Sequence, residues 1–287
     1  MVYADSLSLR RLALLGARHG PDWWLRYSPP LIGLTFAALM PEQRKHVAAN
    51  LKRLGLPSRL ATLRTFASYA ACLAEGMALA AGRDVSPHVE VDGAEHLDTA
   101  LADGRGVILA TAHVGPWDAA APLLARRRDL EVSIVMRRER DGAARAFHDG
   151  LREGGGVQVL HVGGDPLEAL SLRRALGPGR ALAFQLDRWR SSGLPSSVPE
   201  GPFRLAALTG APLVGVFAAR CGVFDYQLRI EPPKRFARRA SRAELATAQQ
   251  ELLGVLIEWI RRYPTQWFDF AGLDLPTAGE KGGSELA

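Results

Sequence analysis

The pattern of apolar and polar positions changes near residue 89. Before it, apolar residues recur at helical spacing, as in 42–54 and 60–81, which predicts a helical region. From there on, short apolar runs alternate with amphipathic stretches, and this alternation is typical of an α/β fold. We therefore expect a mixed, largely parallel central sheet flanked by helices.

The individual elements follow from the same pattern. The runs expected to form strands are 89–91, 106–112, 132–135, 157–161, 181–186, 213–218 and 226–231. The stretches expected to form helices are 117–127, 142–150, 166–176, 203–209 and 241–262. We divide the chain into a helical N-terminal region (1–88), an α/β core (89–270) and a tail (271–287). The tail has little apolar content, which predicts disorder.

Positive charge is concentrated in the N-terminal region. The chain carries a net charge of +6, and residues 1–64 alone hold ten Lys/Arg against three acidic residues, a local excess of +7. Trp23 and Trp24 lie among these cations, as in segments that rest on anionic membranes. The alternative is an ordinary amphipathic helix packed on the domain.

A transmembrane helix is not expected. The apolar run 31–40 has about half of the ~20 residues that a bilayer requires, and Pro29-Pro30 and Pro41 bracket it. Residues 1–9 lack the basic start and long apolar core of a signal peptide. Cys72 and Cys221 are far apart in the sequence, and each lies in an apolar stretch. We therefore interpret them as reduced core residues.

The strongest chemical signal is Thr111-Ala-His113-Val-Gly115-Pro-Trp-Asp118, directly after a predicted strand. Pro116 favours a helix start, which places His113 at the strand exit and Asp118 in the first helical turn. Across such a corner a carboxylate can hold one imidazole nitrogen while the other acts as a base on a hydroxyl. The alternative is a capping aspartate beside an incidental histidine.

This segment resembles the His-x-x-x-x-Asp/Glu motif of the lysophospholipid acyltransferase superfamily. Within it, the chain is most similar to bacterial lipid A lauroyl/myristoyl acyltransferases and mycobacterial phosphatidylinositol mannoside acyltransferases. Four more ordered segments carry the resemblance, at 44–51, 91–97, 209–214 and 264–267. The sequence departs from the family at 189–198, which is short and rich in serine.

The resemblance implies roles for individual residues. His113 would be the general base and Asp118 would fix its tautomer. Backbone N–H groups near Gly115, at a helix N-terminus, could stabilise the oxyanion. The residues expected to bind substrate are Gly115, Arg137, Asp187, Arg188 and Gly201. Asp187 could orient a substrate or pair with an arginine near the site. No metal or cofactor is expected, since the other histidines lack metal-ligand spacing.

The function expected from this resemblance is direct acyl transfer, without a covalent enzyme intermediate. The donor would be acyl carrier protein or acyl-CoA, and the acceptor a hydroxyl of a glycolipid such as a lipid A precursor. We expect a peripheral enzyme on the anionic cytoplasmic face of the bacterial inner membrane, with no nucleic acid as partner. The alternatives are a lysophospholipid or glycerophosphate acyltransferase, and a catalytically silent protein that binds membrane or nucleic acid.

Overall fold

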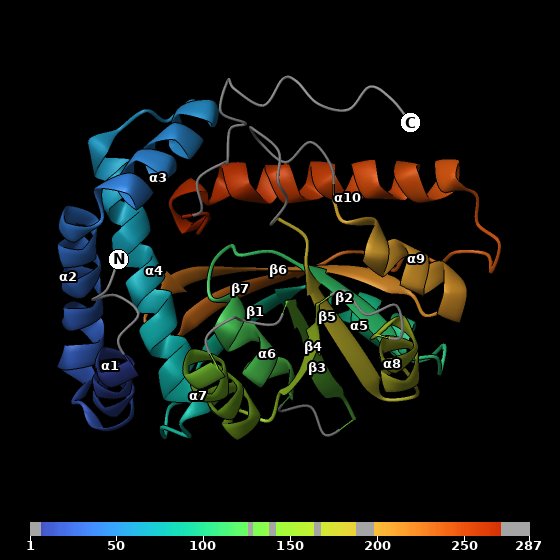
Figure 1. The fold of residues 1–287 in the computed structure, drawn as a ribbon, viewed down its shortest axis with the longest axis horizontal. Coiled ribbons are helices and arrows are strands. Elements are labelled where there is room, and N and C mark those ends of the chain that lie inside the picture. Colours follow the sequence, from blue (N-terminus) through green and yellow to red (C-terminus); the bar gives the residue numbers. More distant parts are fainter. Residues whose placement is uncertain (1–6, 126–128, 138–141, 164–167, 188–197, 271–287) are drawn as a thin grey trace, which may run out of the picture.

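The computed structural model describes residues 7–125, 129–137, 142–163, 168–187 and 198–270, and Figure 1 shows its fold. A seven-stranded sheet with the order β1-β7-β6-β2-β5-β3-β4 lies at its centre. The strands are β1 (His88–Asp92), β2 (Val107–Thr111), β3 (Glu131–Arg137), β4 (Gln158–Val162), β5 (Arg180–Gln185), β6 (Leu213–Gly222) and β7 (Asp225–Ile230). Only the β6–β7 pair is antiparallel among these described strands, which confirms the predicted mixed, largely parallel sheet.

Helices cover both faces of the sheet and form a separate layer at one end (Figure 1). The helices are α1 (Leu7–His19), α2 (Asp22–Leu39), α3 (Pro41–Arg53), α4 (Arg59–Ala80), α5 (Ala94–Leu101), α6 (Trp117–Ala125), α7 (Gly142–Gly154), α8 (Glu168–Ala175), α9 (Glu200–Thr209) and α10 (Arg242–Arg262), with a 3-10 turn η1 (Pro264–Gln266). The larger apolar core lies between the sheet and the helices α9 and α10. A second core lies on the opposite face, under α5 and α6.

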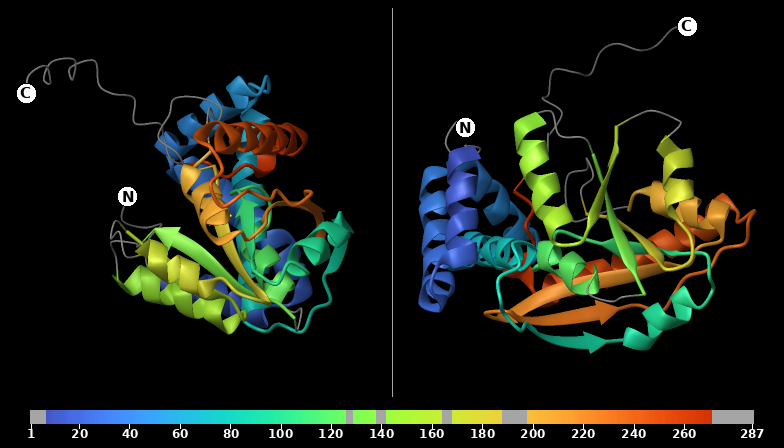
Figure 2. Two further views of the ribbon diagram at one scale, coloured as in Figure 1. Left: turned by 90° about the vertical axis from the view of Figure 1, so that its right-hand side faces the viewer. Right: turned by 90° about the horizontal axis from the view of Figure 1, so that it is seen from below.

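The N-terminal region is helical, as predicted, and packs through α4 onto the rest of the molecule. Both figures place α1 and α2 together at one end of the molecule (Figures 1 and 2). The prolines Pro29 and Pro30 lie inside α2, so the apolar run that follows them continues a helix that begins at Asp22. Pro29 belongs to the buried stripe of α2, and packing on this stripe offsets the lost backbone hydrogen bonds.

Close packing holds α2 on α4. A methyl group added at Gly33 of α2 would lie 2.4 Å from the backbone oxygen of Phe66 in α4, so only glycine fits there. Within the described residues, no helix combines the length and the apolar character that crossing a bilayer requires.

Candidate active site

His113 and Asp187 follow two adjacent parallel strands. Thr111 ends β2 and Gln185 ends β5, and these two residues are direct partners in the sheet register. The Leu186 N–H donates to the Thr111 carbonyl at 2.8 Å, which extends the pairing by one step. His113 and Asp187 each lie two residues beyond the paired ends. The register of the sheet therefore brings the two side chains together at its carboxyl edge, where sites in α/β folds gather.

The Asp187 carboxylate holds the imidazole of His113. Its Oδ1 lies 2.8 Å from His113 Nδ1, and its Oδ2 accepts the His113 backbone N–H at 3.0 Å. The indole Nε1–H of Trp267 also donates to Oδ2, at 3.3 Å. Because an ionised carboxylate only accepts hydrogen bonds, this network assigns the ring proton to Nδ1 and leaves a lone pair on Nε2.

Asp118 has a different partner. It lies in the first turn of α6 and forms an ion pair with Arg152 of α7, at 3.4 Å between Oδ1 and the guanidinium. Arg152 also stacks over the ring of Trp117, whose edge meets the His113 ring at 5.1 Å between centroids. The ring nitrogen that we expected Asp118 to hold is therefore bonded to Asp187 instead.

Gly115 has a structural reason to be glycine. Its φ is +64°, and an added methyl group would lie 2.3 Å from the carbonyl oxygen of Ala218. Its N–H donates to the Gln266 carbonyl at 2.8 Å, so this amide is already engaged and the expected oxyanion donor must come from elsewhere. A contact between Gly115 and substrate stays a prediction.

The remaining predicted site residues are less closely gathered. Arg137 ends β3, the parallel neighbour of β5, and so shares the sheet edge with Asp187. Gly201 lies exposed in the first turn of α9. Arg188 falls outside the described residues, as do 189–197 and the tail. Substrate binding by these residues stays a prediction.

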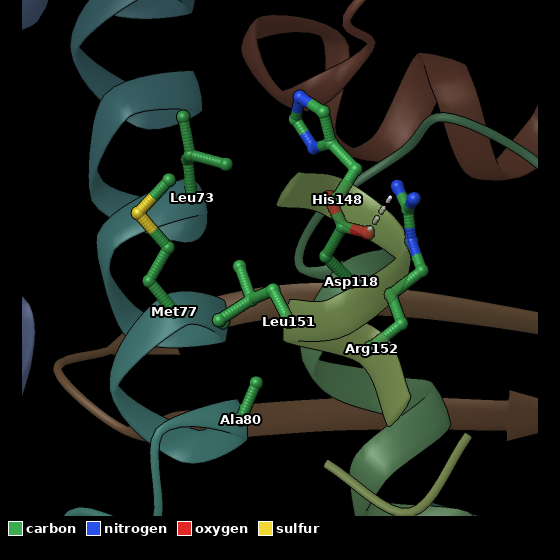
Figure 3. Close-up of a pocket in the computed structure, with 8 residues that line it drawn as sticks. Leu73, Met77, Ala80, Asp118, His148, Leu151 and Arg152 are labelled. Carbon is green, nitrogen blue, oxygen red and sulfur yellow. Dashed lines mark hydrogen bonds and ion pairs between the residues drawn. The ribbon is translucent and has the colours of Figure 1, made fainter. Parts of the chain in front are cut away.

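Two adjoining pockets lie beside the loop and helix that follow His113. One, drawn in Figure 3, lies between α4 and α7. Its lining combines apolar side chains with a polar edge, and consists of Leu73, Gly76, Met77, Ala80, Asp118, His148, Leu151 and Arg152. The other is lined by residues 115–118 with Tyr69, Cys72, Leu73 and Phe268. The pockets share Leu73 and Asp118, so they adjoin each other. We call the part lined by Leu73, Met77, Ala80 and Leu151 the apolar groove.

A buried polar cluster that sequence reasoning missed lies behind the pockets. Glu75 of α4 is 1% exposed; its two oxygens accept from Arg220 of β6 and from the hydroxyl of Tyr226 in β7, each at 2.9 Å. Burial raises the pKa of Glu75 above its ordinary value, against the opposing effect of Arg220. The sequence signal for this cluster was an acidic residue, Glu75, in an otherwise apolar stretch of α4. Among the described residues, no group of acidic, histidine or cysteine side chains is placed to hold a metal ion.

Comparison with known proteins assigns the class. Residues 7–271 match the family described as bacterial lipid A biosynthesis acyltransferase. The chain is 35% identical over 133 residues to the phosphatidylinositol mannoside acyltransferase of Mycobacterium tuberculosis, covering 43% of this chain and 42% of that relative. It is 30% identical over 217 residues to the protein of the same name from Mycolicibacterium smegmatis, covering 71% and 68%.

The chain therefore belongs to the bacterial lipid A biosynthesis acyltransferase family, which confirms the resemblance drawn from its motifs. The first of these matches spans about two fifths of the length of the Mycobacterium tuberculosis relative.

Proposed function

We propose that this protein is an O-acyltransferase that moves a fatty acyl chain from an acyl thioester to a hydroxyl group of a glycolipid. The observation that carries the proposal is the buried His113–Asp187 pair, which leaves the lone pair of His113 Nε2 available as a base. The loop that follows His113, at residues 115–118, lines one of the two pockets. Donors of two kinds, acyl carrier protein and acyl-CoA, supply the same thioester.

The chemistry needs only residues of this chain. His113 Nε2 takes the proton from the acceptor hydroxyl while that oxygen attacks the thioester carbonyl carbon. The tetrahedral intermediate then collapses, the carbon–sulfur bond breaks, and the imidazolium returns the proton to the leaving thiolate. Asp187 keeps the Nδ1 proton in place and stabilises the imidazolium as it forms. Such base catalysis typically contributes about 10²–10⁴-fold.

The apolar groove offers a place for the acyl chain. Leu73, Met77 and Ala80 of α4 face Leu151 of α7, while Asp118 and Arg152 form a charged edge (Figure 3). An alkyl chain would lie against the apolar walls, because that placement removes hydrocarbon from water. The charged edge would then lie near the thioester end of the donor.

For the acceptor, the named relatives favour a phosphatidylinositol mannoside over a lipid A precursor. Both are glycolipids with sugar hydroxyls, so the same base serves either one. Arg137, Arg188 and Gly201 would contact the polar part of the substrate. A lysophospholipid or glycerophosphate acceptor is the second candidate, carried by the wider superfamily motif around His113.

We further propose that the N-terminal helices dock on the anionic cytoplasmic face of the bacterial inner membrane. Large apolar side chains point outward from α1 and α2, with Leu12 66%, Trp23 63% and Leu31 63% exposed. Apolar side chains among arginines are suited to the interface between lipid headgroups and acyl chains.

Vesicle co-sedimentation tests the membrane proposal. The double variant Leu12→Ser/Leu31→Ser should bind anionic vesicles several-fold less than wild type, because it would bury less apolar surface in the membrane. Leu208→Ser removes a leucine of α9 that is 51% exposed and should bind like wild type. Binding that ignores both lipid charge and the double substitution would contradict this docking surface.

Thiol release tests the proposed activity. The purified protein is mixed with acyl-CoA or acyl carrier protein and with each acceptor in turn: phosphatidylinositol mannoside, lipid A precursor or lysophospholipid. His113→Ala should abolish release, whereas His96→Ala should not, because His96 lies on α5, where it contacts the Ile230 carbonyl and Glu95. No release with any pair, or more than about a tenth of wild-type rate in folded His113→Ala, would contradict the proposal.

A further inference from the structure

Residues 266–268 run antiparallel to the loop that carries His113. The Gly115 N–H donates to the Gln266 carbonyl, and the Phe268 N–H donates to the His113 carbonyl, both at 2.8 Å. Between these two bonds, Trp267 lies opposite Val114. The histidine loop is thus paired with β5 through Asp187 on one side and with residues 266–268 on the other.

The Gln266 side chain fixes this segment to the sheet. Its Oε1 accepts the Arg220 N–H at 2.9 Å, and its Nε2 donates to the Arg220 carbonyl at 3.0 Å. Arg220 is in turn bonded to buried Glu75 of α4. The segment therefore cannot shift along the histidine loop without breaking several partly buried hydrogen bonds, which is costly.

Trp267 reaches from this fixed segment to Asp187. Its ring is 5% exposed, and its Nε1–H is the third donor on a carboxylate whose side chain is 1% exposed. The other two donors both belong to His113, whereas Trp267 donates from a separate segment of the chain. A donor on a separate, fixed segment opposes rotation of the carboxylate together with the ring that it holds.

We propose that Trp267 is a positioning residue for the acyl transfer proposed above, on which this inference rests. Its indole N–H stops rotation of the Asp187 carboxylate, and the carboxylate then holds the His113 ring with Nε2 toward the acceptor hydroxyl. Without this N–H, the His113–Asp187 pair still forms, but Nε2 of His113 is less precisely oriented. Alignment of a base with its proton acts on the chemical step and leaves substrate binding unchanged.

The test compares two substitutions that each delete one buried indole hydrogen bond. Trp267→Phe removes the bond to Asp187, and Trp259→Phe removes the bond from Trp259 Nε1–H to the Ala218 carbonyl at 3.1 Å. We expect kcat to fall about 10-fold in Trp267→Phe with KM unchanged, a loss on the scale of one charge-assisted hydrogen bond. Trp259→Phe should lose thermal stability to a similar extent while keeping kcat.

Proton NMR of the His113 Nδ1–H gives a readout that does not need turnover. We expect this resonance to move and to exchange faster with water in Trp267→Phe, and to stay unchanged in Trp259→Phe. Incorporating benzothienylalanine at position 267 replaces the N–H by sulfur at nearly the same shape, so it should reproduce the Phe result even if Phe destabilises the fold.

An unchanged resonance and equal kinetics in the two Phe variants would overturn the proposal and leave Trp267 with a packing role. Failure of the proposed acyl transfer would look different. In that case thiol release would be absent in wild type and every variant, while the His113 resonance would still report whether Trp267 holds the pair.

Discussion

Two aspartates flank His113 in different environments. The Asp187 side chain is 1% exposed, lies 2.8 Å from the ring nitrogen and receives three N–H donors. The Asp118 side chain is 27% exposed and meets Arg152 at 3.4 Å, at the edge of a pocket. One carboxylate is thus fixed before any substrate arrives, and the other is placed to respond to a ligand.

The difference teaches that sequence proximity does not decide which carboxylate bonds the His113 ring. A buried and fully bonded group acts in a medium of low dielectric, where its charge is felt strongly. A partly exposed ion pair is screened by water and contributes about 0–1 kcal/mol. Substitutions of the two aspartates, and of a third and buried carboxylate, Glu75, test these roles.

Asp187→Asn should have the largest effect. An amide of the same size presents a donor as well as an acceptor, so it no longer enforces the proton on Nδ1. We expect kcat to fall about 10³- to 10⁴-fold, as when the aspartate of a Ser-His-Asp triad is changed to asparagine. Asp225→Asn is the control, because Asp225 also lies 2.8 Å from a histidine Nδ1, that of His88, but at an exposed position. A loss below 10-fold in Asp187→Asn would show that Asp187 does not orient the base.

Asp118→Asn should have an intermediate effect. The ion pair with Arg152 weakens, and the charged edge of the groove loses its shape, while the His113–Asp187 pair stays in place. We expect kcat/KM to fall roughly 10-fold, less than for Asp187→Asn. The rates of both variants should be measured with one donor and acceptor. A loss equal to that of Asp187→Asn would place Asp118 in the proton transfer itself, and no loss would reduce it to a helix cap.

Glu75→Gln should leave turnover within about twofold of wild type and change the pH dependence of stability instead. Burial raises the pKa of Glu75 in the folded state, so the folded state holds its proton more tightly than the unfolded chain does. The resulting stabilisation is complete below the unfolded pKa and is lost as pH rises through the folded pKa. The Tm of wild type minus that of Glu75→Gln should therefore decrease as pH rises through that window. A difference that is independent of pH would contradict the raised pKa.

The sequence pattern predicted most of the fold. All seven strands lie where apolar runs were expected, and the predicted helices are confirmed with shifted ends. The helix α5 was missed, because eight residues after a glycine give too short a periodic signal. No bounds were predicted for α2, which runs through Pro29 and Pro30 and packs on α4.

The site was predicted only in part, for a physical reason. His113 and Asp187 were both recognised as residues that end strands, yet Asp118 was chosen as partner because it is near in sequence. The correct pairing depends on β2 and β5 being neighbours, and strand order across more than 70 intervening residues is not encoded in local periodicity. Trp267 was seen as part of a motif, but its bond to Asp187 needs the same tertiary information.

The late position of residues 266–268 has a consequence for biosynthesis. A ribosome releases the sheet, α4 and the histidine loop well before it adds the residues that pair with that loop. Asp269, made later still, accepts from the Asn50 amide of α3 through its backbone carbonyl at 3.1 Å, so the first helices also gain a partner at this moment. Until residue 266 has been made, the histidine loop lacks these contacts. Under the proposed function, the orientation of the base is completed only when residues 266–268 pair with its loop.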